Sequence, residues 1–322
     1  MADYKGIKGF KVTSIAGDPT NKVVGDVYYD TTANALKFVG GPSGTWASGG
    51  ALNAVRSGRA GAGTQTAGIA FGGWYPTTAV HGSTELYNGT SWTEVNDLNT
   101  ARASLAGASN GTQAASLAFG GAAGPVEQDV SEEFNGTSWV EGNDLNGIKA
   151  YAGGSGTQTA ALAICPAGSV EAYNGTSWTE VNDLNTSRNN NVGCGTQTAS
   201  LTFQGYTPGG NTVNVELYNG TSWTEVNNLN TARHAGGGAG ISTAAITFAG
   251  TSPLFSMTES YNGTSWTEVA DLATARTRIA GAGSTAGATA ALGIGGQSPP
   301  VIANVEEWNV SAGGTVKTVT VS

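Results

Sequence analysis

Histidine and cysteine, the residue types best suited to metal binding and nucleophilic catalysis, are scarce in this sequence of 322 residues. The chain contains only His81, His234, Cys165 and Cys194. They lack the short spacing of a zinc motif, and no phosphate-binding loop of the GxxxxGK[ST] type is present. Two cysteines cannot build a disulfide framework; they could face each other across neighbouring repeats, but free cysteines are usually buried and inert. We therefore expect no enzyme, no metal ion and no cofactor.

A glutamate and a basic residue recur at fixed distances from a tryptophan. The glutamate precedes the tryptophan by seven positions, and the basic residue follows it by ten. Because identical catalytic sites in every repeat would be unusual, we expect tryptophans packed between repeats and charged residues paired between strands. The tryptophans are Trp92, Trp139, Trp178, Trp223 and Trp266, after an earlier Trp46, and the arginines include Arg102, Arg188, Arg233 and Arg276.

The elements that must position these residues follow from the pattern around them. A small-residue stretch follows each basic residue, and then an alternating run such as "AGIAFGG" at 67–73, typical of a strand in a two-sided sheet. A loop, a Glu-x-aromatic strand and the tryptophan strand complete the unit. Four short strands in about 39 to 47 residues make one blade of a β-propeller, so an all-β fold with six blades is predicted.

Asn-Gly-Thr opens the phrase "YNGTSWTEVNDLNTAR" at Tyr87 and its later copies. Asn-Gly between two strands predicts a hairpin with a type I′ turn, because both residues tolerate positive φ. The same letters form a glycosylation sequon. In a chain without a recognisable secretory signal, we interpret the sequon as a by-product of the turn.

The repeated residues resemble the kelch family. The resemblance covers about residues 35 to 310 and implies a six-bladed kelch-like β-propeller. The copper oxidases of that family need paired histidines and a Tyr–Cys unit, which this chain lacks, and the Asp boxes of sialidase propellers are also absent. The kelch pattern includes a Gly-Gly pair, and three repeats depart from it. They have "AICPAG" at 163–168, Gln204-Gly205 and Ala249-Gly250 in its place. The matching residues in the first repeat are Gly72, Gly73, Glu85, Tyr87, Trp92, Leu98 and Arg102.

Two domains are predicted: an N-terminal arm with a β-hairpin at 1–34, and the propeller at 35–322. The hairpin pairs Val27–Tyr29 with Leu36–Val39 around "DTTAN". Two segments compete to complete the last blade, the strand of Trp46 and the alternating tail at 315–322. We expect the Trp46 strand to take that place and the tail to add an edge strand.

Loop length varies most between the second and third strands of each repeat, on the face that also carries the crossings between blades. Binding residues often lie on such loops. We expect contacts with a protein or glycan from Trp74, Tyr75, Tyr206, Phe255 and Met257. The alternative is that these side chains fold down and cap their blades.

The net charge and the hydropathy of the chain disfavour two classes of partner, nucleic acids and membranes. The formal net charge is −9, whereas nucleic-acid binding needs clustered Lys and Arg. No apolar run approaches the ~20 residues of a membrane helix, and "MADYKGIKGFKV" lacks a secretory core. We expect synthesis in the cytoplasm, with no nucleic-acid partner and no membrane insertion.

The segment "GDVYYDTTANALKFVGGPSGTW" at 25–46 is similar to hairpins common in tailed-phage fibre and virion proteins. The resemblance implies a non-enzymatic bacteriophage virion protein, a tail fibre, spike or capsid decoration. Its N-terminal arm, with Lys5, Lys8 and Lys11, is expected to bind other virion proteins, and its loops to bind a host surface protein or glycan. The alternative is a cellular kelch-type protein-interaction adaptor.

Overall fold

The computed structural model describes residues 12–20, 26–39, 44–75, 79–251, 253–283, 287–310 and 316–319. These residues form strands, turns and one short 3₁₀ helix, η1 (Pro166–Gly168), so the all-β prediction is confirmed for them. The chain divides into two compact units. One combines residues 1–44 with 310–322, and the other spans 45–309.

The first unit is a small sheet built from both ends of the chain. Its strand order is β1-β2-β3-β32, with β1 parallel to β2 and the other pairs antiparallel. The predicted hairpin is present, with Val27 opposite Phe38 and Asp30 opposite Ala35. Lys37 Nζ lies 2.8 Å from Asp30 Oδ2 and secures this hairpin. The strands are β1 (Thr13–Ile15), β2 (Val27–Asp30), β3 (Ala35–Val39) and β32 (Val316–Thr318).

This sheet changes the expected division of the chain. A boundary after residue 34 would separate β3 from β2, but the two strands pair over their whole length. The tail was expected at an edge of the propeller, whereas β32 pairs with β3 because that edge of the hairpin is open. The expected anchor residues Lys5, Lys8 and Lys11, and tail residues 315 and 320–322, lie outside the described residues.

The second unit consists of four-stranded antiparallel sheets that follow one another along the chain. We name each sheet after its first strand. The β5 sheet contains β5 (Ala60–Thr64), β6 (Ala67–Phe71), β7 (Thr84–Tyr87) and β8 (Trp92–Val95). The β9 sheet contains β9 (Ala106–Gly107), β10 (Ser116–Phe119), β13 (Ser131–Phe134) and β14 (Trp139–Glu141). The β15 sheet contains β15 (Gly153–Thr157), β16 (Ala160–Ile164), β17 (Val170–Tyr173) and β18 (Trp178–Val181).

The remaining sheets repeat this order. The β19 sheet contains β19 (Val192–Thr196), β20 (Ala199–Phe203), β23 (Val215–Tyr218) and β24 (Trp223–Val226). The β25 sheet contains β25 (Gly237–Ile241), β26 (Ala244–Phe248), β27 (Thr258–Tyr261) and β28 (Trp266–Val269). The β29 sheet contains β29 (Ala280–Gly283), β30 (Ala290–Gln297), β31 (Val301–Val310) and β4 (Gly44–Ser48). Two small hairpins add β11 (Ala122–Ala123) with β12 (Val126–Glu127), and β21 (Tyr206–Thr207) with β22 (Gly210–Asn211).

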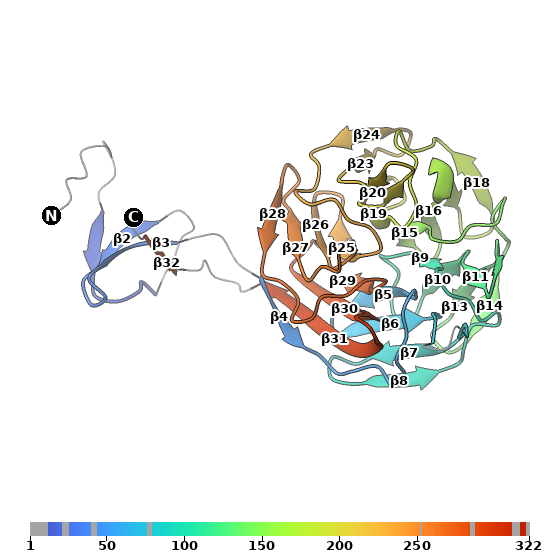
Figure 1. Ribbon diagram of the computed structural model, residues 1–322, viewed down its shortest axis with the longest axis horizontal. Coiled ribbons are helices and arrows are strands. Elements are labelled where there is room, and N and C mark those ends of the chain that lie inside the picture. The colour runs from blue at the N-terminus through green and yellow to red at the C-terminus, as the bar shows by residue number, and fades with distance from the viewer. Residues whose placement is uncertain are drawn as a thin grey trace. The chain divides into compact units, whose positions relative to one another are not determined.

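These sheets are arranged as in a β-propeller. Their first strands lie near the centre of the unit and their last strands at its rim (Figure 1). Neighbouring first strands approach so closely that glycine is required between them. A β-carbon on Gly154 would lie 2.3 Å from the carbonyl oxygen of Gly107, and one on Gly281 would lie 2.1 Å from that of Gly238. The small-residue stretches of the sequence therefore form the central strands.

The last place in the β29 sheet belongs to β4, as expected, and not to the tail. The ring of Trp46 packs edge-on against Phe248 of the β25 sheet, with centroids 4.8 Å apart. It also lies 5.5 Å from Trp308 of its own sheet. Strands from early and late in the chain thus share one sheet.

The Asn-Gly turns form hairpins of a different kind from the one predicted. Tyr87 pairs with Trp92, so four residues form the connection, and only Gly89 has a positive φ, of 90°. The type I′ prediction is therefore wrong. Asn88 instead uses its side-chain oxygen to accept the backbone N–H groups of Thr90 and Ser91, each at 2.9 Å. An asparagine favours this turn through its side chain rather than through left-handed backbone.

Candidate functional site

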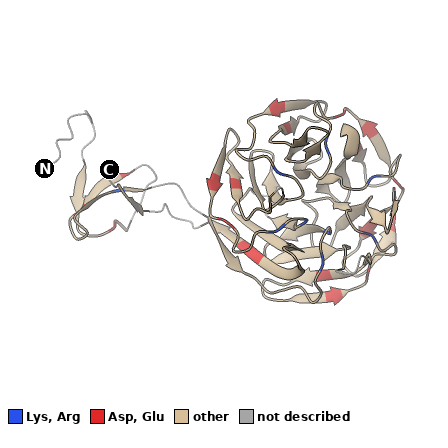
Figure 2. Ribbon diagram, in the orientation of Figure 1, with Lys and Arg blue, Asp and Glu red and all other residues tan. Residues whose placement is uncertain are grey.

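Buried ion pairs join each crossing segment to the third strand of the sheet that it enters. Arg56 Nη2 lies 2.7 Å from Glu85 Oε1, and Arg276 Nη2 lies 2.7 Å from Glu306 Oε1. The same pairing joins Arg102 to Glu132, Arg188 to Glu216 and Arg233 to Glu259, while Lys149 lies 3.7 Å from Glu171. The basic residue stands in the crossing and not in a strand, which differs from the expected pairing between strands. In the second unit, Figure 2 shows acidic residues on many of the strands and basic residues in the connecting segments.

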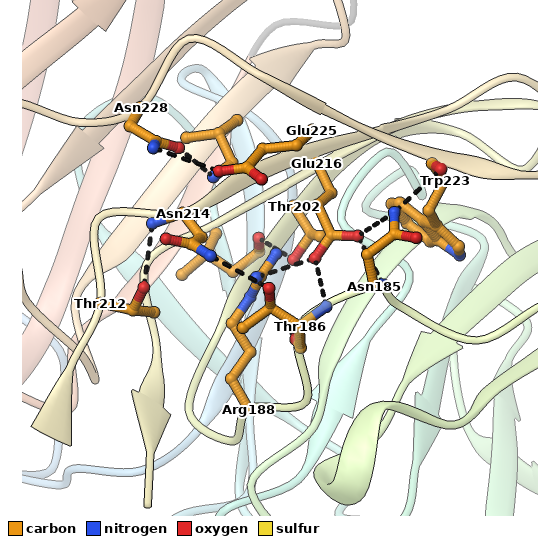
Figure 3. A network of polar contacts seen from close by, with 12 residues as sticks. Asn185, Thr186, Arg188, Thr202, Thr212, Asn214, Glu216, Trp223, Glu225 and Asn228 are labelled. Carbon is orange, nitrogen blue, oxygen red and sulfur yellow. Dashed lines mark hydrogen bonds and ion pairs between the residues drawn. The ribbon is translucent and has the colours of Figure 1, made fainter. Parts of the chain in front are cut away.

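Each of these glutamates except Glu306 also binds an asparagine that was not among the predicted residues, and Glu306 accepts the backbone N–H of Ala273 instead. In the β19 sheet, Glu216 Oε2 accepts the backbone N–H of Asn185 at 2.7 Å and its side-chain N–H at 2.9 Å (Figure 3). The same side-chain nitrogen donates to the carbonyl of Trp223 at 2.9 Å. The signal was present, because an asparagine follows the tryptophan by seven positions in all but one repeat, where Ala273 replaces it.

Burial disfavours the charged form of these arginines, and the neighbouring glutamates favour it. Desolvation lowers the pKa of Arg188, and the charge of Glu216 opposes that shift. A buried charge left without its partner is strongly destabilising. The repeated pairs are therefore suited to holding the crossings in place, and their burial leaves them poorly placed to meet a partner.

The repeated tryptophans are buried between neighbouring sheets. Trp139 packs on Phe71 of the preceding sheet at 4.9 Å between ring centroids, and Trp178 packs on Phe119 at 5.0 Å. Trp266 packs on Phe203 in the same way, at 5.2 Å. Trp92 and Trp223 are buried too, each against a tyrosine of its own sheet.

A glutamine in the connection between the first and second strands of several sheets provides a second link between sheets. Gln113 Nε2 donates to the carbonyls of Gly68 and Tyr87 in the preceding sheet, at 3.0 and 2.6 Å. Gln158 and Gln197 repeat the arrangement with their own preceding sheets. Gln65 donates to the carbonyl of Trp308 at 2.8 Å, which connects the β5 sheet to the β29 sheet.

The loop face is the side of the second unit that carries the crossings and the connections between second and third strands. Backbone bridges join the two kinds of segment, as between Ser57 and Trp74 or between Asn189 and Tyr206. The predicted binding residues all lie in these connections. They are distributed over three sheets and do not form one cluster.

Their exposure differs from residue to residue. Trp74 is half-buried and donates its indole N–H to Ser104 Oγ at 3.4 Å, while Tyr75 is half-buried and stacks on His81 at 4.3 Å. Phe255 and Met257 are also half-buried, and the guanidinium of Arg233 lies 5.7 Å from the Phe255 ring.

Tyr206 is the most exposed of the predicted set, at 45%. Its ring meets His234 edge-on at 5.2 Å, and His234 Nδ1 lies 2.7 Å from Asn211 Oδ1. Burial and the charge of Arg278 lower the pKa of His234, which favours the neutral imidazole. This group offers an aromatic face beside fixed polar atoms.

A ring of backbone hydrogen bonds surrounds the centre of the loop face. It uses the residue two positions after each basic residue of the repeat, and all six have positive φ, between 51° and 62°. Ser104 donates to Gly58, Tyr151 to Ser104, Asn190 to Tyr151, Ala235 to Asn190, Arg278 to Ala235, and Gly58 to Arg278, at 2.6 to 3.2 Å. Non-glycine residues in this conformation cost about 1 kcal/mol each, so the ring must offset that strain.

Inside the ring lies an axial cavity of about 140 Å³. Segments from all of the sheets line it, beginning at Gly58, Ser104, Tyr151, Asn190, Ala235 and Arg278. The predicted residues do not include this site. The available signal was the position two residues after each basic residue, which varies in charge and size from repeat to repeat.

The two cysteines are buried in separate sheets. Burial raises the pKa of Cys165 and of Cys194 to about 12, so both thiols stay protonated near neutral pH. Among the described residues, no three His, Cys, Asp or Glu side chains gather as metal ligands. Nor does that part of the chain contain a helix long and apolar enough to cross a membrane.

Neither a protein-family model nor a curated protein matches this chain.

Proposed function

We propose that the second unit is a closed six-bladed propeller of the kelch type and that the protein is a non-enzymatic component of a bacteriophage virion. In this proposal the loop face contacts a host surface protein or glycan, or a neighbouring virion protein. The small sheet of β1, β2, β3 and β32 attaches the propeller to the virion.

The contrast between interior and loop face carries this proposal. The arginine–glutamate pairs and the tryptophans repeat from sheet to sheet and are buried. Asparagines and glutamines repeat with them and link one segment to the next. The connections on the loop face do not repeat, and Tyr206 stands exposed there. Scaffolds that hold variable loops in fixed positions are typical of binding proteins. The resemblance of residues 25–46 to virion hairpins supports the phage assignment, and many copies on one particle would turn weak contacts into firm adhesion.

Two measurements test the proposal. Mass spectrometry of purified virions tests the location, and absence of the protein from the particle would contradict it. Adsorption of the protein of residues 1–322 to host cells tests the loop face. We expect Tyr206→Ala with Tyr75→Ala to reduce adsorption at least tenfold, whereas Val140→Ala, on the exposed edge strand β14, should not change it. Equal adsorption by all three folded proteins would remove the loop face from the proposal.

A further inference from the structure

The two faces of the small sheet differ in what covers them. On one face, Tyr28 is 3% exposed and Asp30 is 2% exposed. The hydroxyl of Tyr28 donates to Asp18 Oδ1 at 2.6 Å, and the backbone N–H of Gly17 donates to Asp30 Oδ1 at 3.0 Å. Both partners belong to the connection between β1 and β2, so the protein's own chain closes this face.

The other face, which we call the open face, is formed by two rows of residues that cross the strands. Opposite residues of an antiparallel pair lie on the same face, so Val27 of β2 stands beside Phe38 of β3. Val12 comes level with Val27, because the residues that follow them are partners in the parallel pair. In the next row, Tyr29 stands beside Leu36. The first row is Val12, Val27, Phe38 and Lys317, and the second is Ser14, Tyr29, Leu36 and Val319.

The open face presents large apolar side chains to solvent. Tyr29 and Leu36 are half-buried. Exposures of 37 to 42% are found for Val12, Val27, Phe38 and Val319. A sheet face that meets water normally carries polar side chains, yet the ion pair of Asp30 and Lys37 lies on the covered face. A sheet that buries its ion pair and exposes its apolar side chains is suited to contact another protein surface.

The charges of the chain favour the open face of a second copy as the partner. The net charge is −9, and exposed glutamates such as Glu94, Glu180 and Glu268 lie on outer strands of the second unit. Like charges oppose contact between two copies through such surfaces. Neither row of the open face contains an acidic residue, and its one basic residue, Lys317, is on the edge strand, where an interface has its polar rim. An apolar face without acidic residues is complementary to itself, as a contact about a two-fold axis requires.

We propose that the open face binds the open face of a second copy of this protein, so that two small sheets pack face to face. Each face then removes the apolar side chains of the other from water, which is the main source of affinity. Four short strands make a small face, so we expect a micromolar rather than a nanomolar dissociation constant. The contact uses the face and not the edges of the sheet. It is therefore compatible with the proposed attachment to a virion and does not depend on it.

Sedimentation equilibrium of the protein of residues 1–322 tests this proposal. Over a range of about 1 to 200 µM, the mean mass should rise from that of one chain toward that of two. Sodium sulfate should strengthen the association, because this salt favours the burial of apolar surface. A mass of one chain at every concentration would overturn the proposal, and so would an association that sodium sulfate weakens.

Two matched double variants locate the contact. Val27→Thr with Phe38→Thr makes the open face polar while keeping a residue type suited to strands, and it should weaken dimerisation at least about tenfold. Val126→Thr with Ile148→Thr is the control, because these residues are 59% and 60% exposed on the loop face of the second unit. This control should dimerise as the wild type does. Equal dimerisation of the wild type and the open-face variant, or an equal loss in both variants, would overturn the assignment.

Photo-crosslinking provides a direct check that does not require a polar face. Benzoylphenylalanine, which is aromatic and photoreactive, replaces Phe38, and copies labelled with nitrogen-15 are mixed with unlabelled copies. Mass spectrometry then distinguishes links between two chains from links within one. We expect links between chains from position 38 to β1, β2, β3 or β32 of the second copy. Links between chains that reach only the second unit, or no link between chains at all, would overturn the proposal.

Discussion

The backbone N–H of Gly58 donates to the carbonyl of Arg278 at 3.0 Å, which joins the first and the last of six equivalent positions. The other four members each donate to the member before them, and Arg278 donates to Ala235. All of them lie outside the central strands and at positive φ. The inner end of the loop face is therefore held by the backbone itself.

Hydrogen exchange should detect this ring. We expect the amides of Tyr151, Asn190 and Ala235 to exchange as slowly as those of the central strands. The backbone N–H of each residue donates a hydrogen bond to a carbonyl within the ring. Amides of the exposed hairpin turns, such as Thr137, serve as the fast reference. Exchange of the ring amides at the rate of those turns would mean that the ring opens independently of the sheets.

Trp178→Ala should lower the free energy of unfolding by about 3–5 kcal/mol, because it empties a site between two sheets. Trp178 is 6% exposed and contacts Phe119. Urea denaturation followed by circular dichroism measures the loss. Val140→Ala is the control, with an expected change within about 0.5 kcal/mol. A loss below about 1 kcal/mol for Trp178→Ala would contradict the packing role.

Glu216→Gln should destabilise the protein by about 3–5 kcal/mol, because it leaves the buried guanidinium of Arg188 without a counter-charge. Glu225→Gln, on the exposed outer strand β24, is the matched control and should change stability little. Both are measured by urea denaturation at neutral pH. Equal effects of the two substitutions would show that the pair is not important for stability.

The buried thiols predict a loss of stability in alkali. Their pKa is raised by burial from 9.0 to about 12, so the folded protein keeps two protons that the unfolded chain releases above pH 9. Stability from this source is complete below pH 9 and falls as pH rises toward 12. Between pH 8 and pH 10 the loss should be about 1.4 kcal/mol for each thiol.

Urea denaturation at the two pH values measures this loss. The double variant Cys165→Ala, Cys194→Ala should lose less stability over the same range, although tyrosines with raised pKa add to the loss above pH 10. The same pH dependence in wild type and variant would argue against the thiols.

Deletion of residues 316–322 should loosen the small sheet and leave the second unit intact. The deletion removes the partner of β3, including the hydrogen bond from the N–H of Val319 to the carbonyl of Leu36, at 2.9 Å. Faster exchange is expected at the β3 amides that face β32, with unchanged exchange in β15 and β19. If β3 exchanged at the same rate with and without the tail, the pairing of the two chain ends would not hold the sheet.

The sequence by itself determined the repeating unit of this protein. In each repeat, the local alternation of residues predicts the strands, and Asn-Gly predicts the hairpin. The fixed spacing of Glu216, Trp223 and Arg233, or of their equivalents, predicts the residues of the interior. Such features depend on neighbours within a few tens of residues, and a repeated pattern reports them several times over. The class of fold and the buried role of the tryptophans follow from that repetition.

Only the tertiary structure decided which distant segments of the chain pair and which side chains they surround. The tail and β4 both present strand edges, and which edge each one meets depends on where the chain returns after all the sheets have formed. Likewise, nothing in the sequence indicates that Arg59 is buried and that its Nε and Nη2 meet no acceptor among the described residues. Long-range pairing and the isolation of a charge are properties of the assembled unit, because each depends on residues that no local pattern brings together.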